Sequence, residues 1–319
     1  VKLLPVFFIF ESMRKFKYYT LFTIFILTIS LVGSVQAQIP NPIENSIYYS
    51  VEEALQAKSA RQLNLRDQHL FFVPSELQNL KELEFLNLMR NNISKWDGEI
   101  FKLKNLNHLN LKLNSLTYIP SKIEKLDKLQ SLDLGSNNIA VIPSEIEKLS
   151  QLKNLHLSLN LLISIPSQLG NCENLEVLEL DNNQLSYLPS EISQLKNLSL
   201  LHLGFNQFNE LDGSWLALPH LKELNLEHNQ LKELPVQISK LKSLESLILN
   251  NNELTTLPEE LTEISTLQML IVSNNNLSQL PNELEKLKNL KTLIALNNNF
   301  SQAEKTRIKK ELPNCKVYL

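Results

Sequence analysis

The chain has 319 residues and a formal net charge of −3 at pH 7, with 31 Lys and Arg against 34 Asp and Glu. Hydrophobic residues make up 43% of the chain, which is sufficient for a large buried core. A chain with no basic excess is a poor candidate for binding nucleic acid or anionic membrane surfaces, and two cysteines cannot support a disulfide-rich fold.

Residues 1–37 have the composition of a secretory signal peptide. Met13 begins a basic segment, Leu21–Val32 is apolar apart from Thr and Ser, and Val35 and Ala37 are short residues at the positions that precede a cleavage site. The pattern predicts a start at Met13, cleavage after Ala37 and an exported protein that is secreted, periplasmic or on the outer surface. An uncleaved anchor is the alternative, but the apolar stretch is short for a membrane span.

Cleavage would make the protein more acidic. The remaining chain has 27 basic and 33 acidic residues, a net charge of −6. We therefore expect neither nucleic-acid binding nor membrane insertion by the mature protein.

An apolar pattern returns every 23 residues over most of the chain, without an insertion or a deletion. Each copy follows L-x-x-L-x-L-x-x-N-x-L, and its first position falls at Ala60, Leu83, Leu106, Leu129, Leu152, Leu175, Leu198, Leu221, Leu244, Leu267 and Leu290. A period of this length predicts an α/β solenoid in which each repeat forms one coil. We expect a horseshoe with a concave parallel sheet of about eleven strands and short helical or 3₁₀ segments on its convex side.

An asparagine follows the predicted strand in every repeat except the first, which has Gln68. A short amide can bond to the backbone groups of a turn that would otherwise remain unpaired. Stacked coils therefore predict an asparagine ladder formed by Asn91, Asn114, Asn137, Asn160, Asn183, Asn206, Asn229, Asn252, Asn275 and Asn298.

The two ends of the solenoid must close its apolar core. Residues 38–59 are predicted as a lead-in and a capping helix that begins after Ser50, since Ser50 and Glu53 form a capping-box pattern. The repeats are assigned to residues 60–302. Residues 303–319 are predicted as a C-terminal cap, with a helix over 303–312 and a last extended piece over 315–319.

The cysteines and tryptophans are both sparse. Cys172 and Cys315 lie six repeats apart, about 30 Å in a stack of strands, so both are expected to be free thiols. Trp96 and Trp215 stand in the two repeats that depart from the usual proline turn. We expect these tryptophans to fill space in the core, with a convex-side contact as the alternative.

The repeat resembles the 23-residue class of the leucine-rich repeat superfamily, and the resemblance covers residues 60–312. The leader, Glu53-Ala54-Leu55-Gln56 and the terminal Leu312-Pro313-Asn314-Cys315-Lys316 resemble exported bacterial members, especially those of spirochaetes. The resemblance implies a horseshoe fold, no catalysis and no cofactor. It also implies binding of a protein or peptide ligand, often at the boundary between host and microbe, where the ligand is host-derived.

The concave face is predicted from the outward positions of each strand x-L-x-L-x. Its middle column changes from amides through ionisable residues to isoleucines: Asn64, Asn87, Asn110, Asp133, His156, Glu179, His202, Asn225, Ile248, Ile271 and Ile294. Basic residues flank its start, acidic residues its middle, and apolar residues its end: Arg66, Arg90 and Lys112, then Asp181, Glu223 and Glu227, then Met269 and Leu296.

Three isoleucines at successive outward positions predict an exposed apolar stripe, and such surface commonly marks an interaction site. Two alternatives are that β-branched residues favour strands, or that the C-terminal segment folds over them. The predicted ligand-binding residues are Ile248, Ile271, Ile294, Met269, Leu296, Glu179, Asp181, Glu223, Glu227, His156 and His202.

His156, Glu179 and His202 suit a metal by residue type, but the two histidines lie two strands apart, about 9–10 Å at the backbone. A hydrogen-bonded polar ladder is expected instead, which would make binding sensitive to pH. Ser131, Asp133 and His156 have no accompanying oxyanion site. We therefore predict no metal, no cofactor and no enzyme activity.

The sequence thus favours an exported recognition scaffold that binds a protein or peptide on its concave face. The acidic centre of that face would favour a basic partner. The alternative is a periplasmic or envelope scaffold that associates with itself.

Overall fold

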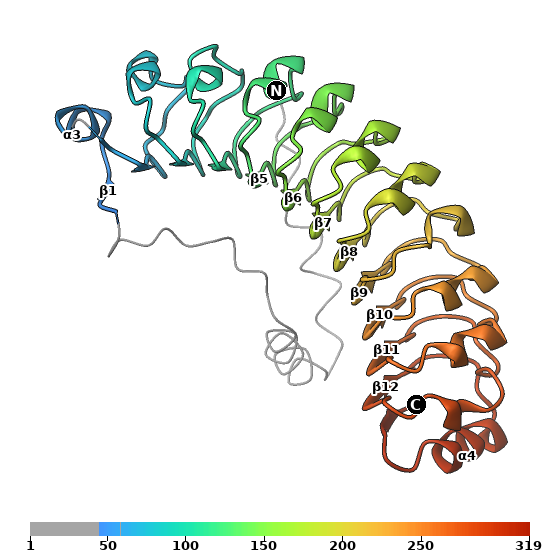
Figure 1. The fold of residues 1–319 in the computed structure, drawn as a ribbon. Coiled ribbons are helices and arrows are strands. Elements are labelled where there is room, and N and C mark those ends of the chain that lie inside the picture. Colours follow the sequence, from blue (N-terminus) through green and yellow to red (C-terminus); the bar gives the residue numbers. More distant parts are fainter. Residues whose placement is uncertain (1–44, 58) are drawn as a thin grey trace, which may run out of the picture. The chain divides into compact units, whose positions relative to one another are not determined.

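The computed structural model describes residues 45–57 and 59–319 (Figure 1). The predicted leader over residues 1–37, with its cleavage site, lies outside the described residues. Residues 40–319 form a compact unit of their own. Among the described residues, no helix is long and apolar enough to cross a membrane.

One parallel sheet runs through the whole unit, and its strands pair in sequence order. The predicted solenoid is confirmed, with thirteen strands rather than eleven because each end of the chain adds one. The strands are β1 (Ile47–Tyr48), β2 (Gln62–Asn64), β3 (Phe85–Asn87), β4 (His108–Asn110), β5 (Ser131–Asp133), β6 (Asn154–His156), β7 (Val177–Glu179), β8 (Leu200–His202), β9 (Glu223–Asn225), β10 (Ser246–Ile248), β11 (Met269–Ile271), β12 (Thr292–Ile294) and β13 (Lys316–Tyr318).

Short 3₁₀ segments form the opposite side of the coils. They span Ser75–Asn79, Ile100–Lys102, Ser121–Lys125, Ser144–Lys148, Ser167–Asn171, Ser190–Gln194, Gly213–Trp215, Val236–Lys240, Glu259–Glu263 and Leu284–Lys286. Within this unit the strands line the inner side of a curve and the 3₁₀ segments its outer side (Figure 1). Paired strands stand only about 4.8 Å apart, whereas helical turns with side chains need more room, so the stack bends toward the sheet.

Each end of the stack is covered by a capped helix and an added strand. Helix α3 (Val51–Gln56) begins after Ser50, whose hydroxyl accepts a hydrogen bond from the backbone N–H of Glu53 at 3.2 Å. Helix α4 (Gln302–Glu311) begins after Ser301, which caps it in the same way. Strands β1 and β13 pair with β2 and β12, so the first and last repeats do not present bare sheet edges.

Leucines and isoleucines of the repeat fill a continuous core. Cys172 occupies one of these apolar positions and is buried, and both cysteines are free, as predicted. Trp215 is only 1% exposed, where other repeats have Leu or Ile, which agrees with a packing role. Trp96 stacks on Phe101 with ring centroids 5.8 Å apart and donates a hydrogen bond to the carbonyl of Tyr118.

The asparagine ladder seals the edge at which the chain leaves each strand. Asn183 is representative: its amide donates to the carbonyls of Leu157 and Leu180, both at 3.0 Å, and its oxygen accepts from the N–H of Leu162 at 3.0 Å. Two of these partners belong to the preceding coil. Each asparagine therefore pairs buried backbone groups of two neighbouring coils at once.

The residue just before each ladder position has a left-handed backbone in all eleven repeats, with φ between 51° and 59°. Most residue types adopt this conformation at a cost, and Asn is among the few side chains that favour it. The eleven residues are Asp67, Arg90, Leu113, Ser136, Leu159, Asn182, Phe205, His228, Asn251, Asn274 and Asn297.

Candidate binding face

The inner face of the sheet is built from the outward residues of the strands, in matched rows. Register pairs His156 with Glu179 and Glu179 with His202, and it likewise pairs Ile248 with Ile271 and Ile271 with Ile294. The predicted middle column is therefore continuous across the sheet. Its residues stand about 4.8 Å apart at the backbone, which is close enough for side chains of adjacent strands to touch.

The centre of this face carries a histidine–carboxylate cluster. His156 Nδ1 lies 2.9 Å from Glu179 Oε2, and His202 Nε2 lies 2.8 Å from Glu223 Oε1. The other ring nitrogen of His202 lies 3.6 Å from Asp181 Oδ2. The arrangement is the polar ladder expected from the sequence, because each histidine is held by carboxylates of neighbouring strands.

The carboxylates change how the two histidines titrate. Burial would lower the pKa of His156, but the hydrogen bond and charge of Glu179, with the charge of Asp133, outweigh it and raise this pKa. The pKa of His202 is raised in the same way, against burial, chiefly by its hydrogen bond to Glu223. Both rings therefore hold a proton at higher pH than an exposed histidine does.

Asp181 is the carboxylate with the largest shift in this cluster. Burial raises its pKa to about 6, and the charges of Glu179 and Glu227 act in the same direction. The charge of His202 and the N–H of Gly204, which donates to Asp181 Oδ1 at 2.8 Å, oppose the shift only in part. The charge of the cluster therefore changes across mildly acidic pH.

The cluster does not have the geometry of a metal centre in the part of the chain that the structure describes. No group of three or more His, Cys, Asp or Glu in residues 45–57 and 59–319 is placed to hold a metal ion. Each histidine nitrogen that contacts a carboxylate is engaged in a pair rather than directed at a shared point.

The apolar end of the column differs from the prediction. Ile248 and Ile271 are only 6% and 2% exposed, so the expected exposed isoleucine stripe is wrong for these two residues. Ile294 and Met269 are half-buried, and Leu296 is exposed. Branched side chains at neighbouring places in the column cover one another, an effect that the residue type of each strand taken singly does not reveal.

The last strand extends this apolar end. Ile294 is paired with Tyr318 of β13, so the C-terminal segment extends the sheet beside the final repeat. Tyr318 itself remains exposed. Leu296 and Tyr318 are thus the well-exposed apolar residues at this end, whereas Ile248 and Ile271 are buried.

The basic residues at the other end of the face are partly neutralised. Arg66 Nε lies 2.8 Å from Asp67 Oδ2, and Arg90 Nε lies 3.3 Å from Asp67 Oδ1. Lys112 is half-buried and close enough to the cluster to lower the pKa of His156 slightly. The inner face therefore carries carboxylates near its middle that have histidines, and no Lys or Arg, as their ion-pair partners.

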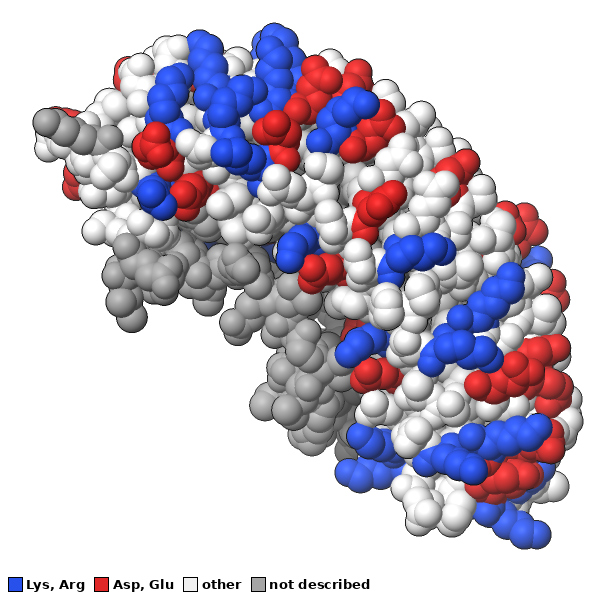
Figure 2. Space-filling model, in the orientation of Figure 1, with Lys and Arg blue, Asp and Glu red and all other residues white. Residues whose placement is uncertain are grey.

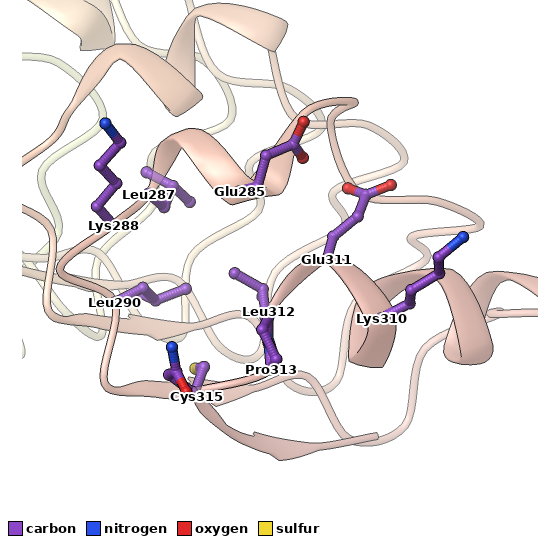
Figure 3. A pocket seen from close by; sticks show the side chains of 10 residues that line it. Glu285, Leu287, Lys288, Leu290, Lys310, Glu311, Leu312, Pro313 and Cys315 are labelled. Carbon is purple, nitrogen blue, oxygen red and sulfur yellow. The ribbon is translucent and has the colours of Figure 1, made fainter.

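One open hollow lies away from the inner face, between the last coil and the C-terminal cap (Figure 3). It has a volume of about 570 Å³ and is lined by Glu285, Leu287, Lys288, Leu290, Lys310, Glu311, Leu312, Pro313, Asn314 and Cys315. The thiol of Cys315 is half-buried there, and burial raises its pKa. A thiol with a raised pKa is a poor nucleophile at neutral pH, so this hollow has no evident chemistry.

A second apolar surface was not predicted from the sequence. It lies on the side of the solenoid formed by the segments that leave the strands, which we call the exit flank. Eight large apolar side chains are exposed there in repeats three to seven: Leu113, Tyr118, Val141, Leu159, Leu161, Ile163, Tyr187 and Phe205. The sequence did contain a signal for this surface, because apolar residues occur in these repeats at variable positions that are usually polar in this pattern.

Charged side chains of both signs are mixed on the face of the molecule drawn in Figure 2. Figure 2 shows one face of the molecule on which Lys and Arg lie interspersed with Asp and Glu, with neither sign gathered into a single field. Such a surface favours solubility and gives little long-range attraction for a charged partner.

Comparison with known proteins agrees with this architecture. The family model described as a leucine-rich repeat region matches residues 97–216 and 214–316. No curated protein sequence matches the chain. A leucine-rich repeat protein of Leptospira interrogans is 30% identical, with 86% of this chain and 99% of that chain covered and a TM-score of 0.37.

Two other solved structures share the fold more closely. The Arabidopsis receptor kinase HAESA, in complex with the peptide hormone IDA and the co-receptor SERK1, is 31% identical with a TM-score of 0.66. The match covers 76% of this chain but only 43% of that one. An internalin of Listeria monocytogenes has a TM-score of 0.70 at 24% identity, covering 81% of this chain and 73% of that one. With the family model matching more than half of its length, the chain belongs to the leucine-rich repeat family.

Proposed function

We propose that this protein is an exported, non-catalytic scaffold that binds a basic segment of a protein or peptide on its inner face. The observation that carries the proposal is the set of four carboxylates at the centre of that face. They are Glu179, Asp181, Glu223 and Glu227, and no Lys or Arg stands at the outward positions of β7 to β10. A face with one sign of charge favours a partner of the opposite sign and increases the rate of encounter.

The apolar C-terminal end of the face supplies the second part of the proposed site. Leu296 and Tyr318 are exposed, Met269 and Ile294 are half-buried, and Ile248 and Ile271 continue the apolar column in the neighbouring strands. An apolar anchor next to a charged region is a common composition of an interface centre. We therefore expect the ligand to combine Lys or Arg with an apolar or aromatic residue.

Solved relatives support binding as the general role. The HAESA structure contains a peptide hormone and a co-receptor, and the structure of the Arabidopsis receptor kinase GASSHO1/SCHENGEN3 contains the peptide ligand CASPARIAN STRIP INTEGRITY FACTOR 2. The second match is 29% identical over 79% of this chain and has a TM-score of 0.65. The chain spans only 34% of the length of that protein, so these ligands indicate a type of role and not the ligand of this chain.

A peptide-display selection tests the proposed site directly. Residues 40–319 form a compact unit capped at both ends, and this segment is immobilised and used to select from a random 12-residue peptide library. We expect enrichment of peptides with at least two Lys or Arg. A variant with Glu179→Gln, Asp181→Asn, Glu223→Gln and Glu227→Gln should lose this enrichment.

The matched control replaces carboxylates outside the inner face. Glu173→Gln and Glu253→Gln alter exposed residues on the outer loops and should leave the enriched peptides unchanged. If the inner-face variant enriches the same basic peptides as the unmodified protein, the proposed site is wrong. Binding of a selected peptide should also weaken at pH 5.5, where Asp181 is protonated and the histidines are charged.

Export is a separate part of the proposal and has its own test. The full chain is expressed in a bacterial host, and the mass of the product outside the cytoplasm is measured. A mass that corresponds to a chain beginning at Gln38 would support the predicted cleavage. A product that stays in the cytoplasm with residues 13–37 attached would refute export without affecting the binding site. A role at the boundary between host and microbe predicts, in addition, that host extracellular proteins contain the recognised basic segment.

A further inference from the structure

The exit flank has features that folding of a single chain does not explain. Leu159 and Ile163 are 53% and 63% exposed, and the eight apolar residues of the flank are each at least 40% exposed. Together they present on the order of several hundred Å² of apolar surface, which is large for a monomeric protein. Exposed apolar side chains gain nothing from burial in the monomer, so the surface is expected to be covered by something else.

These apolar residues are adjacent in space because neighbouring coils are hydrogen-bonded along the flank. The N–H of Ile119 donates to the carbonyl of Val141, and the N–H of Leu161 donates to the carbonyl of Ile139. The N–H of Asn137 donates to the carbonyl of Leu159. The apolar residues therefore lie on the same side of stacked coils, with the uncharged Ser136 and Asn182 between Leu113, Leu159 and Phe205.

Three of the eight residues also have an unfavourable backbone. Leu113, Leu159 and Phe205 have φ values of 57°, 59° and 53°, in the left-handed region that such side chains rarely adopt. The same position is Asn in repeats nine to eleven, where the residues form a polar ladder through Asn251 and Asn274. Each leucine or phenylalanine therefore destabilises the folded chain relative to a residue that suits this backbone.

The flank also lacks charge at its centre. Residues 135–142 and 158–165, which form the flank of repeats four and five, contain no Asp, Glu, Lys or Arg. The charges at its two ends have opposite signs. Lys95 and Lys112 lie toward the N-terminal end, where Arg90 is paired with Asp67. Glu210, Glu233 and Glu253 lie toward the C-terminal end, with Lys232 among them.

From these observations we propose that the exit flank binds a second copy of this chain, with the two solenoids antiparallel. A two-fold axis at repeat five places repeat three of one copy against repeat seven of the other. Leu113 then faces Phe205, Leu159 faces itself, and Lys95 of repeat two faces Glu233 of repeat eight. A parallel arrangement would place like charges against each other at both ends, and that costs binding energy.

The shape of the unit is compatible with this pairing. The strands line the inner side of a curve (Figure 1), and rotation about an axis through the middle of a curve maps it onto itself. Repeat five is one coil from the middle of the eleven repeats. Two copies therefore stack along their flanks with the same curvature, so both inner faces stay open, and a closed two-fold contact gives a dimer rather than a filament.

The apolar area is sufficient for such a dimer. A stable interface buries roughly 800 Å² on each partner, with an apolar centre and a polar rim. The flank has this composition, since its uncharged centre is bordered by charged residues at both ends. The dimer does not depend on the inner-face proposal, because none of the eight apolar residues of the flank is among the proposed ligand-binding residues.

The test is the mass of residues 40–319 by sedimentation equilibrium between 1 and 100 µM. We expect a reversible monomer–dimer equilibrium in the unmodified protein. The variant Leu113→Asn, Leu159→Asn and Phe205→Asn should raise the dissociation constant at least tenfold. Asn is the residue found at the same left-handed position in repeats nine to eleven, so this variant should fold at least as well as the original.

Two further variants test the partner and the direction of pairing. Val236→Asn alters an apolar residue that is also exposed but lies outside the flank, and should leave the dissociation constant unchanged. Lys95→Glu and Glu233→Lys should each weaken the dimer, and the double variant should restore it, because the antiparallel pairing brings these two residues to the same end of the contact.

The proposal is overturned if the unmodified protein remains a monomer at 100 µM, or if the triple asparagine variant dimerises equally well. A parallel dimer would be shown by single charge variants that leave the dissociation constant unchanged, because each exchanges one like-charge pair for another. That result would overturn the antiparallel arrangement.

Discussion

The parallel sheet has an entry edge, at the amino ends of its strands, and an exit edge, at their carboxyl ends. Both are lined by side-chain ladders with the period of the repeat, but the ladders differ in burial. At the edge where the chain leaves the strands, buried asparagines such as Asn183 bond to backbone groups of two coils. At the edge where the chain enters, long charged side chains pair at the surface, as in Lys153 with Glu176 at 3.2 Å and Lys222 with Glu245 at 3.5 Å.

The difference teaches that the spacing of a ladder does not determine its energetic value. A buried amide that is removed leaves backbone donors and acceptors unpaired, which costs the full desolvation of each group. An exposed ion pair that is removed leaves groups that water can solvate, and its contribution is small. The exit edge should therefore carry most of the polar contribution to stability, and four measurements test this comparison.

The largest effect is expected for Asn183→Ala. The substitution removes three hydrogen bonds of 3.0 Å and leaves the buried N–H of Leu162 without a partner. The carbonyls of Leu157 and Leu180 each lose one of two donors, because they also accept from Asn160 and Asn206. We expect the free energy of unfolding to fall by about 3 kcal/mol, measured by urea denaturation followed by circular dichroism. Gln68→Ala is the matched control, because Gln68 occupies the same place in the first coil but is exposed. Equal losses for the two variants would contradict the comparison.

The next effect depends on pH and concerns Asp181, also at the exit edge. Its pKa is raised from 3.8 to about 6, so the folded state favours its protonated form. The corresponding stability is fully present below about pH 4 and is lost as the pH rises through about 6. At pH 7.5 the free energy of unfolding of Asp181→Asn, measured by urea denaturation, should exceed that of the original protein by roughly 1–3 kcal/mol. At pH 4 the two free energies of unfolding should be equal.

The histidines of the same cluster add a contribution of the same sign. Because the pKa values of His156 and His202 are raised, their stability is present below pH 6.5 and is lost as the pH rises through the higher folded values. The original protein should therefore lose stability from this cluster between pH 4 and pH 8. A stability that rises over this range, in both the original and Asp181→Asn, would show that the cluster is not the controlling site.

Leu159→Asn is expected to have a smaller effect, and a gain in stability rather than the loss expected for Asn183→Ala. Relief of the left-handed backbone at φ 59° should raise the free energy of unfolding by about 1 kcal/mol. Leu161→Asn is the control, since Leu161 is also exposed but does not have a positive φ. Both should be measured near 1 µM, below the expected dimer range. The same gain for both variants would indicate an effect of surface polarity and not of the backbone.

The smallest effect is expected at the entry edge. Lys222→Ala removes an ion pair in which the lysine side chain is 57% exposed. We expect a change below about 0.5 kcal/mol that becomes smaller as salt is added, because salt screens an exposed ion pair. A loss near that of Asn183→Ala would remove the distinction between the two edges.

Much of the fold could be predicted because the period of 23 residues acts on every coil in the same way. Leucine spacing predicts the strands, and the asparagine after each strand predicts the ladder, since both depend on local geometry repeated along the stack. The capping helices were predicted from Ser50 and from the helical pattern after residue 302, and they occur at Val51–Gln56 and Gln302–Glu311.

The candidate sites were predicted less well because exposure depends on neighbouring coils. The sequence places Ile248 and Ile271 at outward positions, but adjacent side chains bury them. The left-handed backbone at Leu113, Leu159 and Phe205 shows that apolar residues are retained there at a cost, and the repeat consensus does not include that cost.

The sequence by itself determined the coil, its period, its core and the order of residues along the inner face. These follow from local spacing, because a residue that recurs every 23 positions meets the same backbone in every coil. Tertiary structure decided which of the outward residues reach solvent, how Asp181 and the histidines titrate, and that apolar side chains of five repeats join into one flank. Those properties depend on what lies next to a residue in the stacked coils, and the stacking exists only after folding.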